Sequence, residues 1–154
     1  FPKKAFISGQ NPLSLSSQAK VKLMNVTQER FQQLVQEALA QIPRKYVQQI
    51  KNVAILVEDF PPPGQNLLGL YHGVPLSQRG SYYGNVPPDV IVLYKQPIES
   101  LCSTEEELKE KIAEVLFHEI GHYFGMDERR LREIEAYRMA KKKGLKLKAN
   151  KKLS

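Results

Sequence analysis

Two histidines and a glutamate lie close together in the segment His118-Glu119-Ile120-Gly121-His122. Residues four positions apart lie on the same face of an α-helix, so both imidazoles can reach one metal ion. Glu119 can then accept a proton from a water that the metal activates. Chance is a weak explanation, because two of the three histidines of the chain have this spacing, with an acid between them. The segment therefore predicts a catalytic zinc site.

An apolar stripe at helical spacing leads up to this motif. Its positions are Leu108, Ile112, Val115 and Leu116. At about 100° per residue, Glu119 falls in the middle of the stripe. An ionised carboxylate on a buried face is costly without a partner, and a metal-activated water would be such a partner. The plainer alternative is a helix with two surface histidines and an incidental glutamate, or one with a histidine capping its C-terminus.

A third zinc ligand has to come from beyond His122, because catalytic zinc takes three protein ligands. Gly125 can adopt the left-handed conformation that ends a helix and reverses the chain, which lets Glu128 fold back toward the metal. Asp127 competes with Glu128, although its short side chain suits the N-cap of the next helix better. The remaining alternatives are Glu133, Glu135 and His72. Because the first two belong to the following helix, we expect both to be dispensable for metal binding.

Residues 118–128 read His-Glu-x-x-His-x-x-Gly-x-x-Glu. They resemble the bacterial minimal metalloprotease-like zincins, a predicted zinc-protease family whose third ligand position holds an acidic residue. The resemblance covers about residues 25–140, with matching segments at 52–58, 71–76, 90–97 and 105–131. It implies a compact zincin-like α+β fold, zinc bound by His118, His122 and Glu128, and Glu119 as general base. The metzincin proteases instead have histidine at the position of Glu128.

Hydrophobic periodicity and capping residues place the elements before the motif. The pattern after Thr27 predicts an amphipathic helix that ends at Pro43 or continues into a short second turn. Residues 53–57 predict a buried strand, and residues 89–94 a strand closed by Pro97. Residues 67–88 indicate mostly loop, with one strand around residues 68–72. These elements predict a small mixed sheet packed on helices.

The elements around and after the motif follow from capping signals. A capping box, either Ser103 with Glu106 or Thr104 with Glu107, precedes the long motif helix. A last helix begins near Asp127 or Glu128 and is expected to dissolve into a lysine-rich tail. The predicted fold class is α+β, a single compact domain with an active-site helix and a C-terminal helix.

The length of 154 residues suits one domain. The composition, with 42% hydrophobic and 25% charged residues, excludes wholesale disorder and a coiled coil. We expect an irregular leader at residues 1–24, a zincin-like domain at 25–140 and a basic tail at 141–154. The net charge of +7 is uneven: residues 1–24 carry +4, residues 25–128 carry −6 and residues 129–154 carry +9. The tail could therefore bind an anionic partner weakly.

The chain has one cysteine, Cys102, and no apolar run long enough to span a membrane. The single cysteine favours a reducing, cytoplasmic setting, and the lack of a long apolar run predicts that the chain does not span a bilayer. The expected function is zinc-dependent hydrolysis of a peptide or protein substrate that lies extended against an exposed strand edge. The alternative is a non-catalytic zinc-binding module whose basic tail binds nucleic acid or a protein assembly. Glu119 favours the enzyme, because a purely structural site has no need of a general base.

Overall fold

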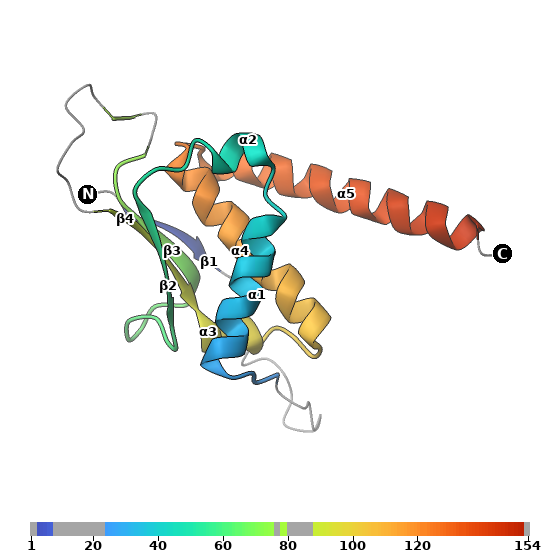
Figure 1. The fold of residues 1–154 in the computed structure, drawn as a ribbon, viewed down its shortest axis with the longest axis horizontal. Helices are drawn as coiled ribbons and strands as arrows, with labels where there is room; N and C mark the ends of the chain where they lie inside the picture. The colour runs from blue at the N-terminus through green and yellow to red at the C-terminus, as the bar shows by residue number, and fades with distance from the viewer. Residues whose placement is uncertain (1–2, 8–23, 76–77, 80–87, 153–154) are drawn as a thin grey trace.

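A four-stranded mixed β-sheet forms the centre of the molecule, and helices lie on one side of it (Figure 1). The computed structural model describes residues 3–7, 24–75, 78–79 and 88–152. The strands are β1 (Lys3–Ile7), β2 (Val53–Glu58), β3 (Leu67–His72) and β4 (Asp89–Tyr94). Their order in the sheet is β1-β3-β4-β2. β3 runs antiparallel to both of its neighbours, whereas β2 and β4 are parallel.

Five helices accompany the sheet in the described ranges. They are α1 (Gln28–Ala40), α2 (Arg44–Val47), α3 (Lys95–Glu99), α4 (Glu105–Tyr123) and α5 (Glu128–Lys152). α1 packs on α4, and α4 lies against β3, β4 and β1. α5 leaves the end of α4 and runs away from the sheet (Figure 1). The predicted α+β class is thus confirmed. None of these described helices has an apolar stretch that could cross a lipid bilayer.

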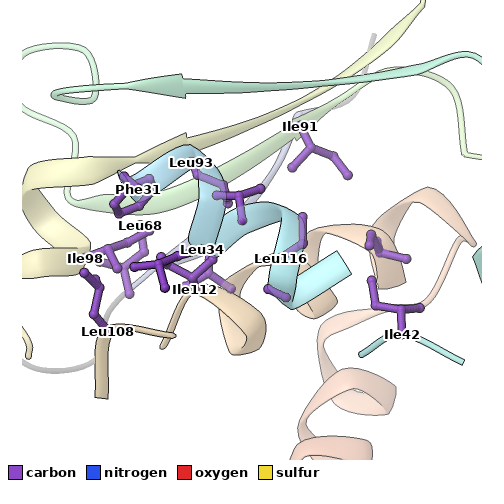
Figure 2. Close-up of a cluster of buried hydrophobic side chains, with 14 of the residues drawn as sticks. Phe31, Leu34, Ile42, Leu68, Ile91, Leu93, Ile98, Leu108, Ile112 and Leu116 are labelled. Carbon is purple, nitrogen blue, oxygen red and sulfur yellow. The ribbon is translucent and has the colours of Figure 1, made fainter. Parts of the chain in front are cut away.

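The core lies between the sheet and the pair α1 and α4, where their apolar stripes meet (Figure 2). Phe31 and Leu34 of α1 and Leu116 of α4 are at most 1% exposed. Leu93 of β4 and Leu68 of β3 close the cluster from the sheet. Burial of these side chains stabilises the fold by about 1.5–3 kcal/mol each, which holds α4 in a fixed position on the sheet.

The capping signals read from the sequence are present. The hydroxyl of Thr27 accepts a hydrogen bond from the Arg30 N–H at 3.1 Å. Of the two predicted pairs, Thr104 with Glu107 caps the motif helix. The Glu107 N–H donates to Thr104 Oγ1, and the Glu107 carboxylate accepts from the N–H of Ser103, the residue before the N-cap. The short turn expected after Pro43 is α2.

Two predictions about strands are wrong. Residues 3–7 of the expected irregular leader form β1, because β3 offers them an unpaired edge. The strand at residues 53–57 is half-buried and lies at the edge of the sheet, with Leu56 47% exposed. Only alternate side chains of β2 face the helices. Within the expected loop at 67–88, β3 is the predicted strand, and residues 76–77 and 80–87 lie outside the described residues.

Two predictions about helices also differ from the structure. Pro97 does not simply close β4, because it lies in the first turn of α3, where a helix needs no backbone N–H. The last helix does not dissolve near residue 141 but continues to Lys152. Its lysine-rich sequence contains no proline, so nothing in it interrupts the helical backbone. The domain boundaries expected at residues 25 and 140 stay a prediction.

Candidate metal centre

The chain reverses direction directly after the second histidine of the motif. Gly125 has a φ of 82°, in the left-handed region. Its N–H donates to the carbonyl oxygen of His122 at 2.9 Å, and the Met126 N–H donates to that of Gly121 at 3.0 Å. These two bonds form a Schellman motif, which ends α4. The reversal predicted at Gly125 is therefore present, and it turns the chain into α5.

The beginning of α5 is fixed against α4 by a cap and by a close contact. Asp127 Oδ1 accepts a hydrogen bond from the Arg130 N–H at 2.8 Å, so Asp127 is the N-cap of α5, as its short side chain suggested. Leu131 is buried against Gly121, where a β-carbon would lie 2.1 Å from Leu131 Cδ2. Gly121 therefore permits α5 to approach α4. Gly121 is one of the unspecified positions of the histidine motif, but a glycine within a helix is itself a signal of close packing.

This arrangement brings His118, His122 and Glu128 together. One ligand atom from each residue lies within 4.8 Å of the others. Glu128 Oε1 is 2.9 Å from His122 Nε2, and Glu128 Oε2 is 3.3 Å from His118 Nε2. Both imidazoles are 1% exposed, whereas the Glu128 side chain is 47% exposed. The cluster is thus open to solvent on the side of Glu128.

The outer nitrogen of each imidazole has a hydrogen-bond acceptor. His118 Nδ1 lies 2.8 Å from Glu135 Oε1, and His122 Nδ1 lies 3.3 Å from the carbonyl oxygen of Met126. If each Nδ1 carries the proton and donates it, both Nε2 atoms keep their lone pairs for a metal. Such contacts fix the tautomer and the ring orientation of metal-binding histidines.

The contact of Glu135 with His118 therefore argues against the expectation that Glu135 is dispensable for metal binding. Glu135 lies seven residues after Glu128, which places both acids on one face of α5. The seven-residue spacing in the sequence indicates that Glu128 and Glu135 share a face of α5. It does not indicate that this face packs against α4. Glu133 points elsewhere: its side chain is 51% exposed and pairs with Arg129 and Arg130. His72 belongs to β3, and its Cα partners are Lys3 and Val90.

Glu119 lies on the buried face of α4, as the stripe predicted, and is 0% exposed. It packs against β3 at Gly69, where a β-carbon would lie 3.2 Å from Glu119 Oε1 and 2.7 Å from Val115 Cγ1. The absence of a side chain at Gly69 thus makes room for the carboxylate. The charge of Glu119 contributes to the raised pKa of His118, so this buried carboxylate lies near the cluster without being one of its three members.

The end of α4 is held by Tyr123, the residue after the second histidine. The phenol oxygen accepts a hydrogen bond from the Lys51 N–H at 3.0 Å and donates to the carbonyl oxygen of Gln49 at 3.2 Å. The guanidinium of Arg79 lies 4.9 Å from the centre of the Tyr123 ring. Arg79 also forms an ion pair with Asp89 at the start of β4. These contacts connect the end of α4 to β4 and to the segment before β2.

The two imidazoles differ in their electrostatic surroundings. Burial alone would lower the pKa of His118, but the hydrogen bond with Glu135 and the charges of Glu128 and Glu119 outweigh it and raise that pKa above its ordinary value. Burial and the neighbouring His118 lower the pKa of His122. His122 is thus the imidazole that more readily stays neutral, as a metal ligand must.

The residues of the cluster fit a zinc ion. The buried Nε2 atoms of His118 and His122 both lie next to the Glu128 carboxylate, at 3.3 and 2.9 Å from its two oxygens. If both Nε2 atoms carry lone pairs, these lone pairs are directed at a negatively charged carboxylate, and a cation held between the three groups would turn this repulsion into attraction. Two imidazole nitrogens and one carboxylate oxygen are a ligand set that catalytic zinc uses, with one position left for water.

An α+β fold with this cluster where α4 turns into α5 has the features of a zincin-like metal site. Residues 50–138 match the zincin-like metallopeptidase family, and this match covers more than half of the chain. The chain belongs to that family, which implies a divalent metal, typically zinc. A comparison with curated proteins finds no matching relative.

Proposed function

We propose that this protein is a zinc-dependent peptidase in which His118, His122 and Glu128 hold the metal and Glu119 is the general base. The observation that carries the proposal is the position of Glu119, a fully buried carboxylate one residue from a three-ligand cluster. A zinc site that serves only the fold needs no such carboxylate. Membership of the metallopeptidase family supports peptides or proteins as the substrate class.

The residues of the site divide the work of hydrolysis. Zinc, when bound, supplies a Lewis acid that polarises the scissile carbonyl and lowers the pKa of water. Glu119 accepts a proton from the attacking water and later delivers it to the leaving amine. Because Glu119 is buried against Gly69, its carboxylate is held in one place for both proton transfers. Glu135 and the Met126 carbonyl keep the two imidazoles in orientation.

The substitution Glu119→Gln tests this assignment. The amide keeps the size of the carboxylate but cannot accept the proton, so turnover of a quenched-fluorescent peptide library should fall by at least about 100-fold. Zinc content, measured by plasma emission after dialysis, should stay at about one ion per chain. Glu114→Gln is the matched control, because Glu114 is a half-buried carboxylate on the same helix that pairs with Lys111 and lies outside the cluster.

Loss of zinc in the Glu119→Gln variant would make Glu119 a ligand and contradict its assigned role. Equal turnover in the Glu119→Gln and Glu114→Gln variants would place the activity elsewhere. Zinc binding without hydrolysis of any peptide in the library would favour the non-catalytic zinc-binding module.

A further inference from the structure

β1 occupies one side of β3, the strand that packs against Glu119. β3 has two neighbours in the sheet, β4 on one side and β1 on the other. β1 itself is hydrogen-bonded to β3 only. Without β1, therefore, the side of β3 opposite β4 would be an open sheet edge with unpaired N–H and C=O groups.

The register of β1 carries its backbone past the general base. Phe6 is the Cα partner of Gly69, and Gly69 is the residue against which the Glu119 carboxylate packs. α4, which bears Glu119 and both imidazoles of the cluster, lies against β1 as well as β3. The backbone of residues 5–7 thus runs beside the proposed catalytic centre.

An extended peptide binds a sheet by adding a strand to an open edge. In the described part of the chain, the sheet has one other edge, the outer side of β2. β4 and β3 separate β2 from β1, so a peptide added to β2 would lie at the far side of the sheet from Gly69. Only the edge that β1 covers would bring an extended peptide to Glu119.

The family match covers the elements that bear the site, and it leaves out β1 together with α1 and α2. The matched residues 50–138 contain β2, β3, β4, α3, α4 and the cluster of His118, His122 and Glu128. Residues 3–7 lie outside the match. Within the matched part, β3 has β4 as its one neighbour, and its other edge is open.

We propose that residues 3–7 act as an internal blocking strand, which occupies the edge of β3 where an extended peptide substrate must pair. Peptide binding would then require β1 to leave β3, so the apparent affinity would scale with the fraction of molecules whose edge is open. This inference rests on the proposed peptidase function for the identity of the ligand. Displacement of β1 would regulate access without changing the metal ligands.

A reversible cross-link between β1 and β3 tests the proposal in the full chain. Ala5 and Leu70 are Cα partners, and facing residues of antiparallel strands have Cα distances of about 4.5–5.5 Å, which a disulfide can span. Leu70 follows Gly69 and therefore points away from α4. The variant is Ala5→Cys with Leu70→Cys, and the two single variants are controls. Burial raises the pKa of Cys102 to about 11, so this native thiol should not compete.

A second variant opens the edge. Ala5→Pro with Phe6→Pro removes two consecutive N–H groups, at least one of which points at β3 in an antiparallel ladder. Ala5→Ser with Phe6→Leu keeps both N–H groups and is the matched control. The probe is a fluorescein-labelled peptide that copies residues 1–8, and the same peptide with proline at the positions of residues 5 and 6 is the negative probe.

Binding of the probe by anisotropy and turnover of the peptide library are measured on the same zinc-loaded samples. We expect the oxidised cross-linked variant to bind the probe at least about tenfold more weakly than after reduction with a phosphine. The proline variant should bind it at least about tenfold more tightly than the wild type, at equal zinc content. If the proline variant fails to fold, the cross-linked variant still decides the question.

Equal probe affinity in the oxidised and reduced cross-linked variant would overturn the blocking role of β1. Hydrolysis of the peptide library at the same measurable rate in these two forms would also overturn the blocking role of β1, and it would leave the proposed catalysis intact. Probe binding in the expected order without hydrolysis in any form would refute the catalysis, while the assignment of the peptide-binding edge would stand.

Discussion

Glu135 provides the sharpest test of how the metal centre is built. Its carboxylate lies 2.8 Å from His118 Nδ1, and it belongs to α5, whereas His118 belongs to α4. We predict that Glu135→Ala weakens zinc binding without removing a ligand. The expected reason is that the imidazole at position 118 becomes less basic and loses the hydrogen bond that fixes its tautomer and orientation.

The size of the effect follows from the contact. A hydrogen bond that involves a charged group contributes about 1.5–3 kcal/mol. The Glu135 side chain is 23% exposed, so water partly replaces what is lost, and the lower end of this range applies. Loss of an outer partner of a metal-binding histidine costs about 10 to 100-fold in metal affinity. We therefore expect a loss near tenfold for Glu135→Ala and a smaller loss for Glu135→Gln, which keeps an acceptor oxygen.

Competition with a chromophoric zinc chelator would measure these affinities at fixed pH. Glu133→Ala is the matched control, since Glu133 is an exposed acid of the same helix, and its affinity should equal that of the wild type. Glu128→Ala should lose more than Glu135→Ala, because it removes a proposed ligand. The reasoning is refuted if Glu135→Ala binds zinc like the wild type, or if Glu133→Ala loses as much.

Three further predictions concern protonation, packing and capping. Zinc affinity, measured by chelator competition, should fall as the pH is lowered from about 8 to about 6, because protons compete with zinc for the imidazoles. The raised pKa of His118 makes this competition begin closer to neutrality. Gly69→Ala should lower peptide turnover with zinc retained, because its β-carbon would displace Glu119 or Val115, whereas Gly144→Ala, with nothing within 4 Å, should leave turnover unchanged. Asp127→Ala should lower the free energy of unfolding by about 1 kcal/mol in urea titrations of the zinc-free protein, with zinc affinity nearly unchanged; a large loss of zinc would instead make Asp127 a ligand.

The local parts of the centre could be predicted from the sequence. Helical periodicity placed Glu119 on the buried face of its helix, and that face is buried. Gly125 predicted the end of the helix and the reversal of the chain, because few other residues adopt a positive φ at low cost. The proximity of Glu128 to both histidines then followed from the reversal. Each of these inferences depends on residues within about one or two helical turns.

Features that depend on contacts between distant segments could not be predicted in this way. Which face of α5 meets α4 is set by the contact of Leu131 with Gly121, so the role of Glu135 could not be read from its type alone. Residues 3–7 form a strand because β3 has an edge to share, more than sixty residues later in the chain. The exposure of β2 follows likewise from its place in the strand order, which its apolar sequence does not encode.

The division of the metal cluster between two helices has a mechanical consequence. α4 is embedded in the core, whereas α5 is joined to it by the short turn at residues 124–127 and supplies both Glu128 and Glu135. A metal bound by this cluster would add a link between the two helices to the contacts that already join them, namely Leu131 with Gly121 and Lys142 with Glu110. At about 1.5 Å per residue, the 25 residues of α5 extend about 37 Å. A rotation of α5 by about 10° about the metal cluster would therefore move its lysine-rich end by about 6 Å. The far end of α5 is therefore the place where a spin label or fluorophore would report the loading of the metal centre most sensitively.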